Sequence, residues 1–265
     1  MNYLEAVVLG VVQGLTEFLP VSSSGHLVLA QSLMGVELPG VLFEVVVHLA
    51  TLCAVCWVYR VRLLQLASGL IRRDRAQVIY TGMLALATIP AVIVGISLGD
   101  TVEAVFESPT IAAGLLLVTG CFVRSIRTRG PLATRNELGP KDAMAVGVAQ
   151  AVAIFPGISR SGSTVAVGTA LGINTIRMAE FSFLLSIPAI GGAAVLQLRD
   201  VSSVGAGIGA GPLAVAFTVA AVSGIFAIHI FLGMLDRRTF HRFAYYCWGI
   251  GLTYLLAATI WPELR

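Results

Sequence analysis

A short polar stretch in the second half of the chain has residue types that suit the binding of an anion. Residues 155–164 read Phe-Pro-Gly-Ile-Ser-Arg-Ser-Gly-Ser-Thr, so Arg160 lies among four hydroxyls and two glycines. Glycines let backbone N–H groups approach a ligand, hydroxyls donate hydrogen bonds, and a guanidinium offers a planar fork that fits phosphate oxygens. The same residues also suit a capped helix start with an arginine that reaches a lipid headgroup. Alone, the stretch does not decide between the two.

A second copy of this stretch favours the anion site. Residues 10–25 and 147–162 align without a gap at an offset of 137 and are identical at seven of sixteen positions. The two copies differ at three positions whose residue types could take different parts in a reaction. The first has Glu17, Ser23 and His26, and the second has Ile154, Arg160 and Ser163 at the aligned positions. One copy therefore brings a carboxylate, a hydroxyl and an imidazole, and the other brings the cation.

The composition indicates an integral membrane protein. Hydrophobic residues make up 57% of the chain and charged residues only 12%, against roughly 25% charged in soluble domains. The formal charge of +3 is small and the basic residues are clustered between apolar runs, which excludes nucleic acid as a partner. Cys53 and Cys56 form a C-x-x-C inside an apolar run, so we interpret them as small apolar side chains. No basic residue precedes the first apolar run, so no cleavable signal is expected.

Two regions contain paired apolar segments that are too short or too interrupted to cross a bilayer. In residues 3–36 and 142–173, a serine-rich turn separates segments that are either shorter than the roughly 20 residues that a spanning helix needs or interrupted by polar residues. The interrupted segment is residues 3–20, with Glu5, Gln13 and Glu17. We expect each region to be a re-entrant helix pair, which is tolerated only where protein or a watery cavity surrounds it.

The longer apolar segments predict six transmembrane helices, and the charges between them predict their orientation. The expected spans are residues 41–59, 77–99, 109–126, 179–198, 212–235 and 244–261. Arginine-rich loops follow the first, third and fifth spans and should be cytoplasmic, whereas residues 100–107 form an acidic outer loop. The prediction is an all-α, inverted-topology repeat: residues 1–126, a cytoplasmic linker over 127–141, and residues 142–265. In such folds, broken helices aim their positive N-terminal ends at an anion near the midplane.

Both motifs resemble a known family. Gln13-Gly-Leu-Thr-Glu17, running into the serine-rich turn and His26, resembles the [E/Q]-x-x-x-E signature of bacterial undecaprenyl-diphosphate phosphatases of the bacitracin-resistance type. Residues 156–164 resemble that family's P-G-x-S-R-S-x-x-T signature. The resemblance covers essentially the whole chain. It implies release of phosphate from undecaprenyl diphosphate, which recycles the lipid carrier for cell-wall synthesis and confers bacitracin resistance at the bacterial cytoplasmic (inner) membrane.

The resemblance and the residue chemistry assign roles to four side chains. An arginine inside the hydrocarbon region is costly unless it is functional, so Arg160 is expected to clamp phosphate. Glu17 shares a helix face with Gln13 and is either a ligand of Mg²⁺ or Ca²⁺, with Gln13, or the catalytic base. Ser23 is the family's preferred nucleophile candidate, with Glu17 or His26 as its base. His26 as nucleophile or acid stays open.

The remaining polar residues of the two motifs are expected to hold phosphate oxygens. With Arg160 these are Ser22, Ser24, Gly25, Ser159, Ser161, Gly162 and Thr164. Glu44 and His48 form an i, i+4 pair that either supports the site or is a buried hydrogen bond. Arg177, Glu180 and His229 are interpreted as structural.

Two other classes of protein compete with the phosphatase. Inverted repeats with broken helices around a charge are also typical of transporters of anions or lipid phosphates. A purely structural membrane protein is the weakest alternative, because it has no need of Arg160 or Glu17. For the phosphatase, the partners are a polyprenyl diphosphate and membrane lipids, the site opens toward the outer face, and a homodimer is left open.

Overall fold

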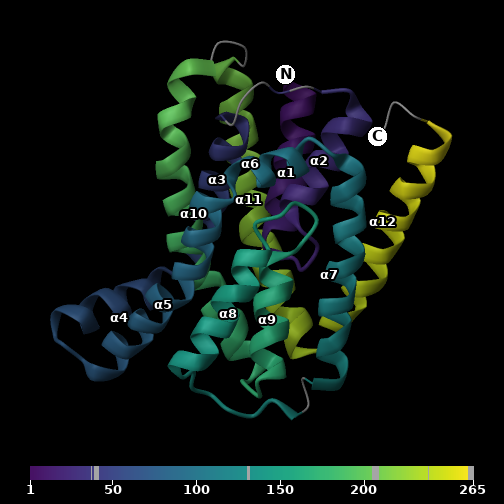
Figure 1. Ribbon diagram of the computed structural model, residues 1–265. Helices are drawn as coiled ribbons and strands as arrows, with labels where there is room; N and C mark the ends of the chain where they lie inside the picture. The colour runs from purple at the N-terminus through teal and green to yellow at the C-terminus, as the bar shows by residue number, and fades with distance from the viewer. Residues whose placement is uncertain (37, 39–41, 130–131, 205–208, 238, 262–265) are drawn as a thin grey trace.

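The chain folds into a bundle of helices. The computed structural model describes all residues except 37, 39–41, 130–131, 205–208, 238 and 262–265 (Figure 1). The first half contains α1 (Tyr3–Phe18), α2 (Ser23–Met34), α3 (Leu42–Val58), α4 (Arg60–Ile71), α5 (Arg75–Ser97), α6 (Gly99–Phe106) and α7 (Pro109–Arg129). The second half contains α8 (Pro140–Val152), α9 (Arg160–Ala170), α10 (Thr175–Val204), α11 (Ala210–Asp236), the short 3₁₀ helix η2 (Phe240–Arg242) and α12 (Phe243–Ile260).

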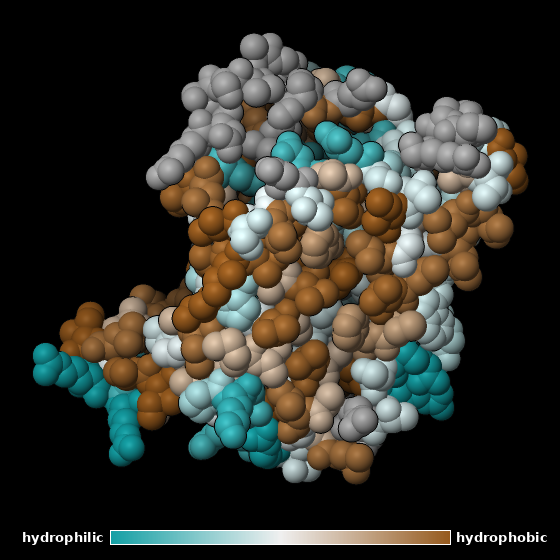
Figure 2. Space-filling model, viewed as in Figure 1, coloured by the Kyte–Doolittle hydropathy of each residue, from teal (hydrophilic) through white to brown (hydrophobic). Residues whose placement is uncertain are grey.

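Several helices are long and apolar enough to cross a membrane. Within the described residues there are five: Arg75–Ser97, Pro109–Thr128, Thr175–Gln197, Ala210–Leu235 and Phe240–Ile260. The pair α3 and α4, bent by 76°, brings the number to six if it counts as one broken span. Figure 2 shows hydrophobic side chains over the middle of one face and hydrophilic ones toward the lower end. The predicted all-α membrane class is therefore confirmed.

The sequence prediction was wrong at two loops. Residues 60–71 and 100–106 were expected within loops, but they belong to α4 and α6. In α4, leucine, arginine, glutamine and alanine are good helix formers and there is no proline, so the helix resumes after the bend. Residue 41, the expected start of the first span, and residues 130–131 of the expected linker lie outside the described residues.

The packing repeats between the two halves of the chain. α1 packs along α11, and α8 packs along α5. The aligned glycines of the two copies permit both contacts: a Cβ at Gly10 would lie 2.8 Å from the carbonyl oxygen of Ala216, and one at Gly147 would lie 2.6 Å from that of Ala87. Only residues without a side chain allow backbones this close.

The pair α1–α2 and the pair α8–α9 meet at their turns inside the bundle (Figure 1). The N–H of Gly157 donates to Ser22 Oγ at 3.0 Å. A Cβ at Gly25 would lie 2.8 Å from both the nitrogen and the Cα of Gly157, so these tips are in direct contact. Ser22 and Gly157 have positive φ angles of 67° and 99°, which is uncommon for a serine. The tight turns aim the N-termini of α2 and α9 at one place.

Aromatic packing fixes the end of α1. Phe18 meets Phe183 edge-on at 5.6 Å between ring centroids, Phe183 meets Phe231 at 4.9 Å, and Phe231 meets Phe240 at 5.0 Å. All four rings are fully buried, and edge-to-face pairs of this kind add to the free energy of burial. The chain of rings joins α1 to α10, α11 and η2, and so holds Glu17 in place.

The linker is tied to the second re-entrant pair at the arginine-rich end. Arg135 donates to both carboxylate oxygens of Asp142 at 3.1 Å each. Its backbone also pairs with Gly172 and Asn174. The hydrogen bonds from Arg135 hold the pKa of the Asp142 carboxyl below its ordinary value.

Candidate active site

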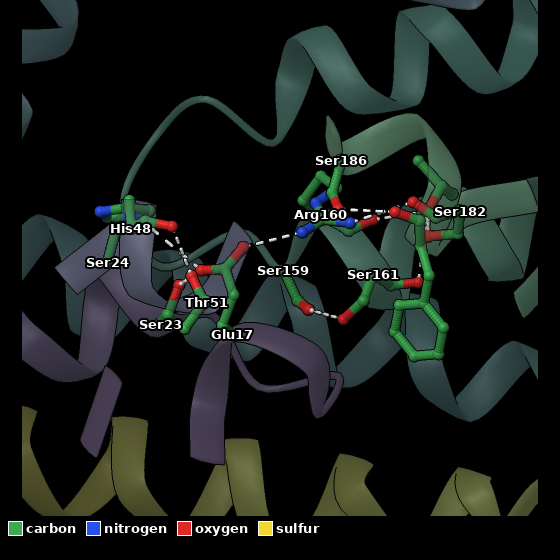
Figure 3. A network of polar contacts seen from close by, with 12 residues as sticks. Glu17, Ser23, Ser24, His48, Thr51, Ser159, Arg160, Ser161, Ser182 and Ser186 are labelled. Carbon is green, nitrogen blue, oxygen red and sulfur yellow. Dashed lines mark hydrogen bonds and ion pairs between the residues drawn. The ribbon is translucent and has the colours of Figure 1, made fainter. Parts of the chain in front are cut away.

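The ends of α1 and α9 bring a carboxylate and a guanidinium together. Arg160 Nη2 donates to Glu17 Oε1 at 2.7 Å, and Arg160 Nη1 donates to the carbonyl oxygen of Ser182 at 3.1 Å (Figure 3). The two charged side chains are only 6% and 13% exposed. Such burial requires that the charges be paired and hydrogen-bonded. One partner comes from each copy of the repeat.

Ser23 completes this cluster. Its hydroxyl donates to Glu17 Oε2 at 2.6 Å, and Gln13 Nε2 donates to the same oxygen at 3.0 Å. A hydroxyl this close to a carboxylate is the arrangement of a nucleophile with its base. Ser23 is the first residue of α2 and Arg160 the first residue of α9. Both positive helix ends therefore lie at the cluster and favour an anion there.

Several predicted phosphate-binding residues serve the two turns. Ser22 and Ser159 are the N-caps of α2 and α9, and their hydroxyls accept from the N–H groups of Gly25 and Gly162 at 3.3 and 3.1 Å. Ser161 donates to the carbonyl oxygen of Leu19 at 3.1 Å, which joins the two tips. These hydroxyls are buried and used within the protein.

Thr164 and the two capping glycines also pack within the fold. Thr164 Oγ1 donates to the carbonyl oxygen of Arg160 at 2.7 Å and lies 2.7 Å from Ser182 Oγ. Gly25 is packed against Gly157, and a Cβ at Gly162 would lie 3.1 Å from Val123. Unlike the buried hydroxyls, the side chain of Ser24 is only half-buried, and its Oγ lies 3.5 Å from Ser22 Oγ. Of the predicted set, Arg160, Ser23 and Ser24 are the best placed to reach a ligand.

The structure does not bring His26 into the cluster. Its Nδ1 is 2.8 Å from the carbonyl oxygen of Ser22, and its Nε2 is 3.0 Å from the hydroxyl of Tyr246. The two rings are stacked, with centroids 5.6 Å apart. Both ring nitrogens are therefore engaged away from Glu17, which does not favour His26 as the nucleophile or as the base of Ser23.

His48 is the imidazole that reaches Glu17. Its Nε2 lies 3.8 Å from Glu17 Oε2. Its Nδ1 lies 2.7 Å from the carbonyl oxygen of Glu44, and since a carbonyl only accepts, Nδ1 carries the proton of that bond. His48 therefore contacts the backbone of Glu44. The carboxylate of Glu44 accepts a hydrogen bond from Gln31 Nε2 at 3.2 Å.

Comparison with known proteins places the chain in a family. The family model described as "Bacitracin resistance protein BacA" matches residues 6–253. This chain belongs to that family. A protein named "Undecaprenyl-diphosphatase" from Desulfatibacillum aliphaticivorans is 39% identical over 97% of this chain and 99% of its own length. Proteins of the same name from Syntrophotalea carbinolica and Methanosphaera stadtmanae are 41% and 35% identical over 95% and 98% of this chain and 97% and 99% of their own lengths.

Two supporting residues of this BacA-family chain have no signal in the sequence. Ser182 holds Arg160 through its carbonyl and Thr164 through its hydroxyl, yet it lies in an apolar span that looks like any other. Thr119 accepts from the N–H of Ser159 at 2.8 Å and donates to the carbonyl of Gly157 at 2.7 Å. Neither motif includes them, so only the folded structure reveals that they position the second tip.

One oxygen atom beside Glu17 has the chemistry of a ligand for a hard divalent cation. Gln13 Oε1 is buried and has no hydrogen-bond partner among the described residues, and it lies on the side chain that contacts Glu17. The described residues contain no group of three or more His, Cys, Asp or Glu side chains that could hold a metal ion. Mg²⁺ at phosphate sites commonly uses one or two protein oxygens together with substrate oxygens and water.

Proposed function

We propose that this chain hydrolyses undecaprenyl diphosphate to undecaprenyl phosphate and inorganic phosphate. The observation that carries the proposal is the Ser23–Glu17–Arg160 cluster, in which a hydroxyl, a carboxylate and a guanidinium meet at two helix N-termini. The relatives' name supplies the substrate. This reaction would recycle the lipid carrier for cell-wall synthesis and account for the bacitracin resistance in the family's description.

The cluster supports attack by Ser23 on the terminal phosphorus. Glu17 Oε2 takes the proton of the Ser23 hydroxyl, to which it is already hydrogen-bonded at 2.6 Å. Ser23 Oγ forms a bond to the phosphorus while the bond to the bridging oxygen breaks, and undecaprenyl phosphate leaves with that oxygen. The leaving undecaprenyl phosphate takes the proton from Glu17, which regenerates the carboxylate. Water, deprotonated by this carboxylate, then attacks the phosphorus of the phosphoserine; the P–Oγ bond breaks, Ser23 Oγ takes the proton back from Glu17, and inorganic phosphate is released.

Arg160 and the helix ends supply the electrostatic part of catalysis. A phosphate oxygen that replaces Glu17 Oε1 at Arg160 would accept a hydrogen bond from Nη2. Nη1 would stay hydrogen-bonded to the carbonyl oxygen of Ser182. Fixed donors that face the developing charge lower the barrier without reorganisation. When Mg²⁺ or Ca²⁺ is bound, Gln13 and Glu17 would hold it, and it would neutralise phosphate charge.

The membrane setting is part of the same proposal. The diphosphate reaches the cluster at the partly exposed Ser23 and Arg160, and the polyprenyl tail lies among the spans, where apolar surface is available. We place the protein in the bacterial cytoplasmic (inner) membrane, with arginine-rich loops inside and the active site open to the outer face. The repeat boundaries at residues 126 and 142 belong to this proposal.

A vesicle assay tests the enzyme against the transporter. Purified protein is reconstituted in vesicles with undecaprenyl diphosphate, and both phosphate release and transbilayer movement of the lipid are followed. The proposal predicts phosphate release that Ser23→Ala abolishes. Counterflow of lipid or anion without phosphate release would assign the chain to the transporters instead.

A further inference from the structure

A polar cavity lies at the arginine-rich end of the molecule. It has a volume of about 150 Å³ and lies between α4, α5, α10 and the linker. Its lining residues are Arg62, Tyr80, Asn136, Leu138, Arg177 and Glu180. None of them contacts the Glu17 cluster in the described structure. The volume is several times the roughly 30 Å³ share of one water molecule, so it admits a group of the size of a phosphate.

Arg62 is held in one orientation at this cavity. Its Nε donates to Glu180 Oε1 at 2.9 Å and its Nη1 donates to Gln77 Oε1 at 2.9 Å. Its guanidinium carbon is 4.8 Å from the centroid of the Tyr80 ring, within the range of a cation–π contact. A guanidinium fixed on three sides loses little further entropy when it binds an anion.

Charge and hydrogen bonding in the cavity are not balanced. Two guanidiniums, Arg62 and Arg177, face the single carboxylate of Glu180, and the Arg177 pair is long at 3.8 Å with a side chain that is 59% exposed. Arg62 lies over the ring of Tyr80 and close to its hydroxyl, but the buried hydroxyl makes no hydrogen bond of good geometry among the described residues. A buried hydroxyl without a partner is unfavourable. An anionic oxygen in the cavity would satisfy both the excess positive charge and the hydroxyl.

The adjoining helix hairpin points to a lipid as the source of that anion. α4 and α5 project from the side of the bundle, and hydrophobic side chains cover much of the hairpin while hydrophilic ones gather at its tip (Figures 1 and 2). On α4, Val61, Leu64 and Ile71 are 60%, 69% and 84% exposed. Exposed Arg72, Arg73 and Arg75 follow at the turn. Exposed apolar residues beside a basic cluster are typical of a segment that lies in an anionic membrane surface.

We propose that this cavity binds the phosphate of an anionic phospholipid headgroup. Arg62 and Arg177 contribute the guanidinium donors, Tyr80 contributes its hydroxyl, and the α4–α5 hairpin lies in the headgroup layer beside the bound lipid. The site is separate from the Glu17 cluster and independent of the reaction proposed there.

The test measures lipid binding to the full-length purified chain. Native mass spectrometry follows the binding of phosphatidylglycerol and, separately, phosphatidylcholine to the wild type and to three variants. Arg177→Gln removes the exposed cation, and Tyr80→Phe removes only the hydroxyl. Arg127→Gln is the matched control, because Arg127 is exposed near the end of α7 and does not line the cavity. Arg62 is left intact because its hydrogen bonds join α4 to α5 and α10.

We expect the wild type to prefer phosphatidylglycerol. Arg177→Gln should weaken the binding of phosphatidylglycerol about fivefold, because each basic residue near an anionic surface contributes ~1 kcal/mol. Tyr80→Phe should weaken this binding roughly two- to tenfold, because one hydrogen bond is lost. Arg127→Gln should stay within about twofold of the wild type. Binding of phosphatidylglycerol that is the same in all four proteins, or no preference over phosphatidylcholine, would overturn the proposal. Inorganic phosphate is tested as a competitor. If it displaces the lipid, and if the same two substitutions weaken its own binding, the site belongs to a free anion and the lipid assignment is overturned.

Discussion

Arg160→Lys tests whether the geometry of the guanidinium, and not its charge alone, serves the reaction. Arg160 divides its donors between Glu17 Oε1 at 2.7 Å and the carbonyl oxygen of Ser182 at 3.1 Å. A lysine keeps the charge but is a single point donor on a flexible stem, so it cannot hold Ser182 and a phosphate at once. Losing one hydrogen bond to a charged group removes about 1.5–3 kcal/mol. We therefore expect kcat/KM to fall at least roughly tenfold.

The assay is phosphate release from undecaprenyl diphosphate by protein in detergent. Arg135→Lys is the matched control, because Arg135 also donates to a carboxylate, that of Asp142, and to a backbone carbonyl, that of Leu171, but its side chain is 50% exposed and lies at the linker. This control should keep kcat/KM within about twofold of the wild type. Thermal unfolding of each variant checks that the bundle is intact.

One result would refute this reasoning. If folded Arg160→Lys keeps more than about a tenth of the wild-type kcat/KM, the loss is under ~1.4 kcal/mol and the forked clamp does not contribute. The positive charge beside Glu17 would then be the only requirement at this position.

Three further predictions address the base, the topology and the tips. Glu17→Gln should reduce phosphate release by at least a hundredfold, and retained activity with an unchanged divalent-ion requirement would show that Glu17 is neither base nor ligand. In a background without native cysteines, Asp74→Cys and Glu137→Cys should react with an impermeant thiol reagent only after the membrane is opened, whereas Glu103→Cys should react in intact cells; outside labelling of position 137 would contradict the inverted repeat. Gly25→Ala should lower both the unfolding temperature and activity, because its Cβ would lie 2.8 Å from backbone atoms of Gly157; wild-type values for both would show that the tips have room to move apart.

The sequence predicted the elements that the repeat and the hydropathy encode. Apolar runs predicted the helices, and the aligned motifs predicted that Glu17 and Arg160 would meet, which they do at 2.7 Å. It failed at α4, because the arginines at and after residues 60–71 are typical of a loop between spans, although most residues of this segment are good helix formers.

The sequence could not show which hydroxyl and which imidazole of the site contact Glu17. Ser22 and Ser23 are adjacent, yet one caps α2 and the other contacts Glu17. His26 is in the motif and contacts Tyr246, while His48, from another helix, lies at Glu17. Which side chain points inward depends on the turn at Ser22 and on long-range packing, and neither is encoded in local spacing.

The most direct test of the whole account compares Ser23→Ala with Ser22→Ala in phosphate release from undecaprenyl diphosphate at saturating Mg²⁺ or Ca²⁺. The wild-type chain should release phosphate. Ser23→Ala should lose several orders of magnitude because the nucleophile is gone, whereas Ser22→Ala should lose roughly 1–3 kcal/mol, or about five- to 150-fold, through the loosened contact with Gly157. No phosphate release by the folded wild type would contradict the proposed activity. Equal losses in the two variants would contradict Ser23 as the nucleophile and leave a water held by Glu17 in its place.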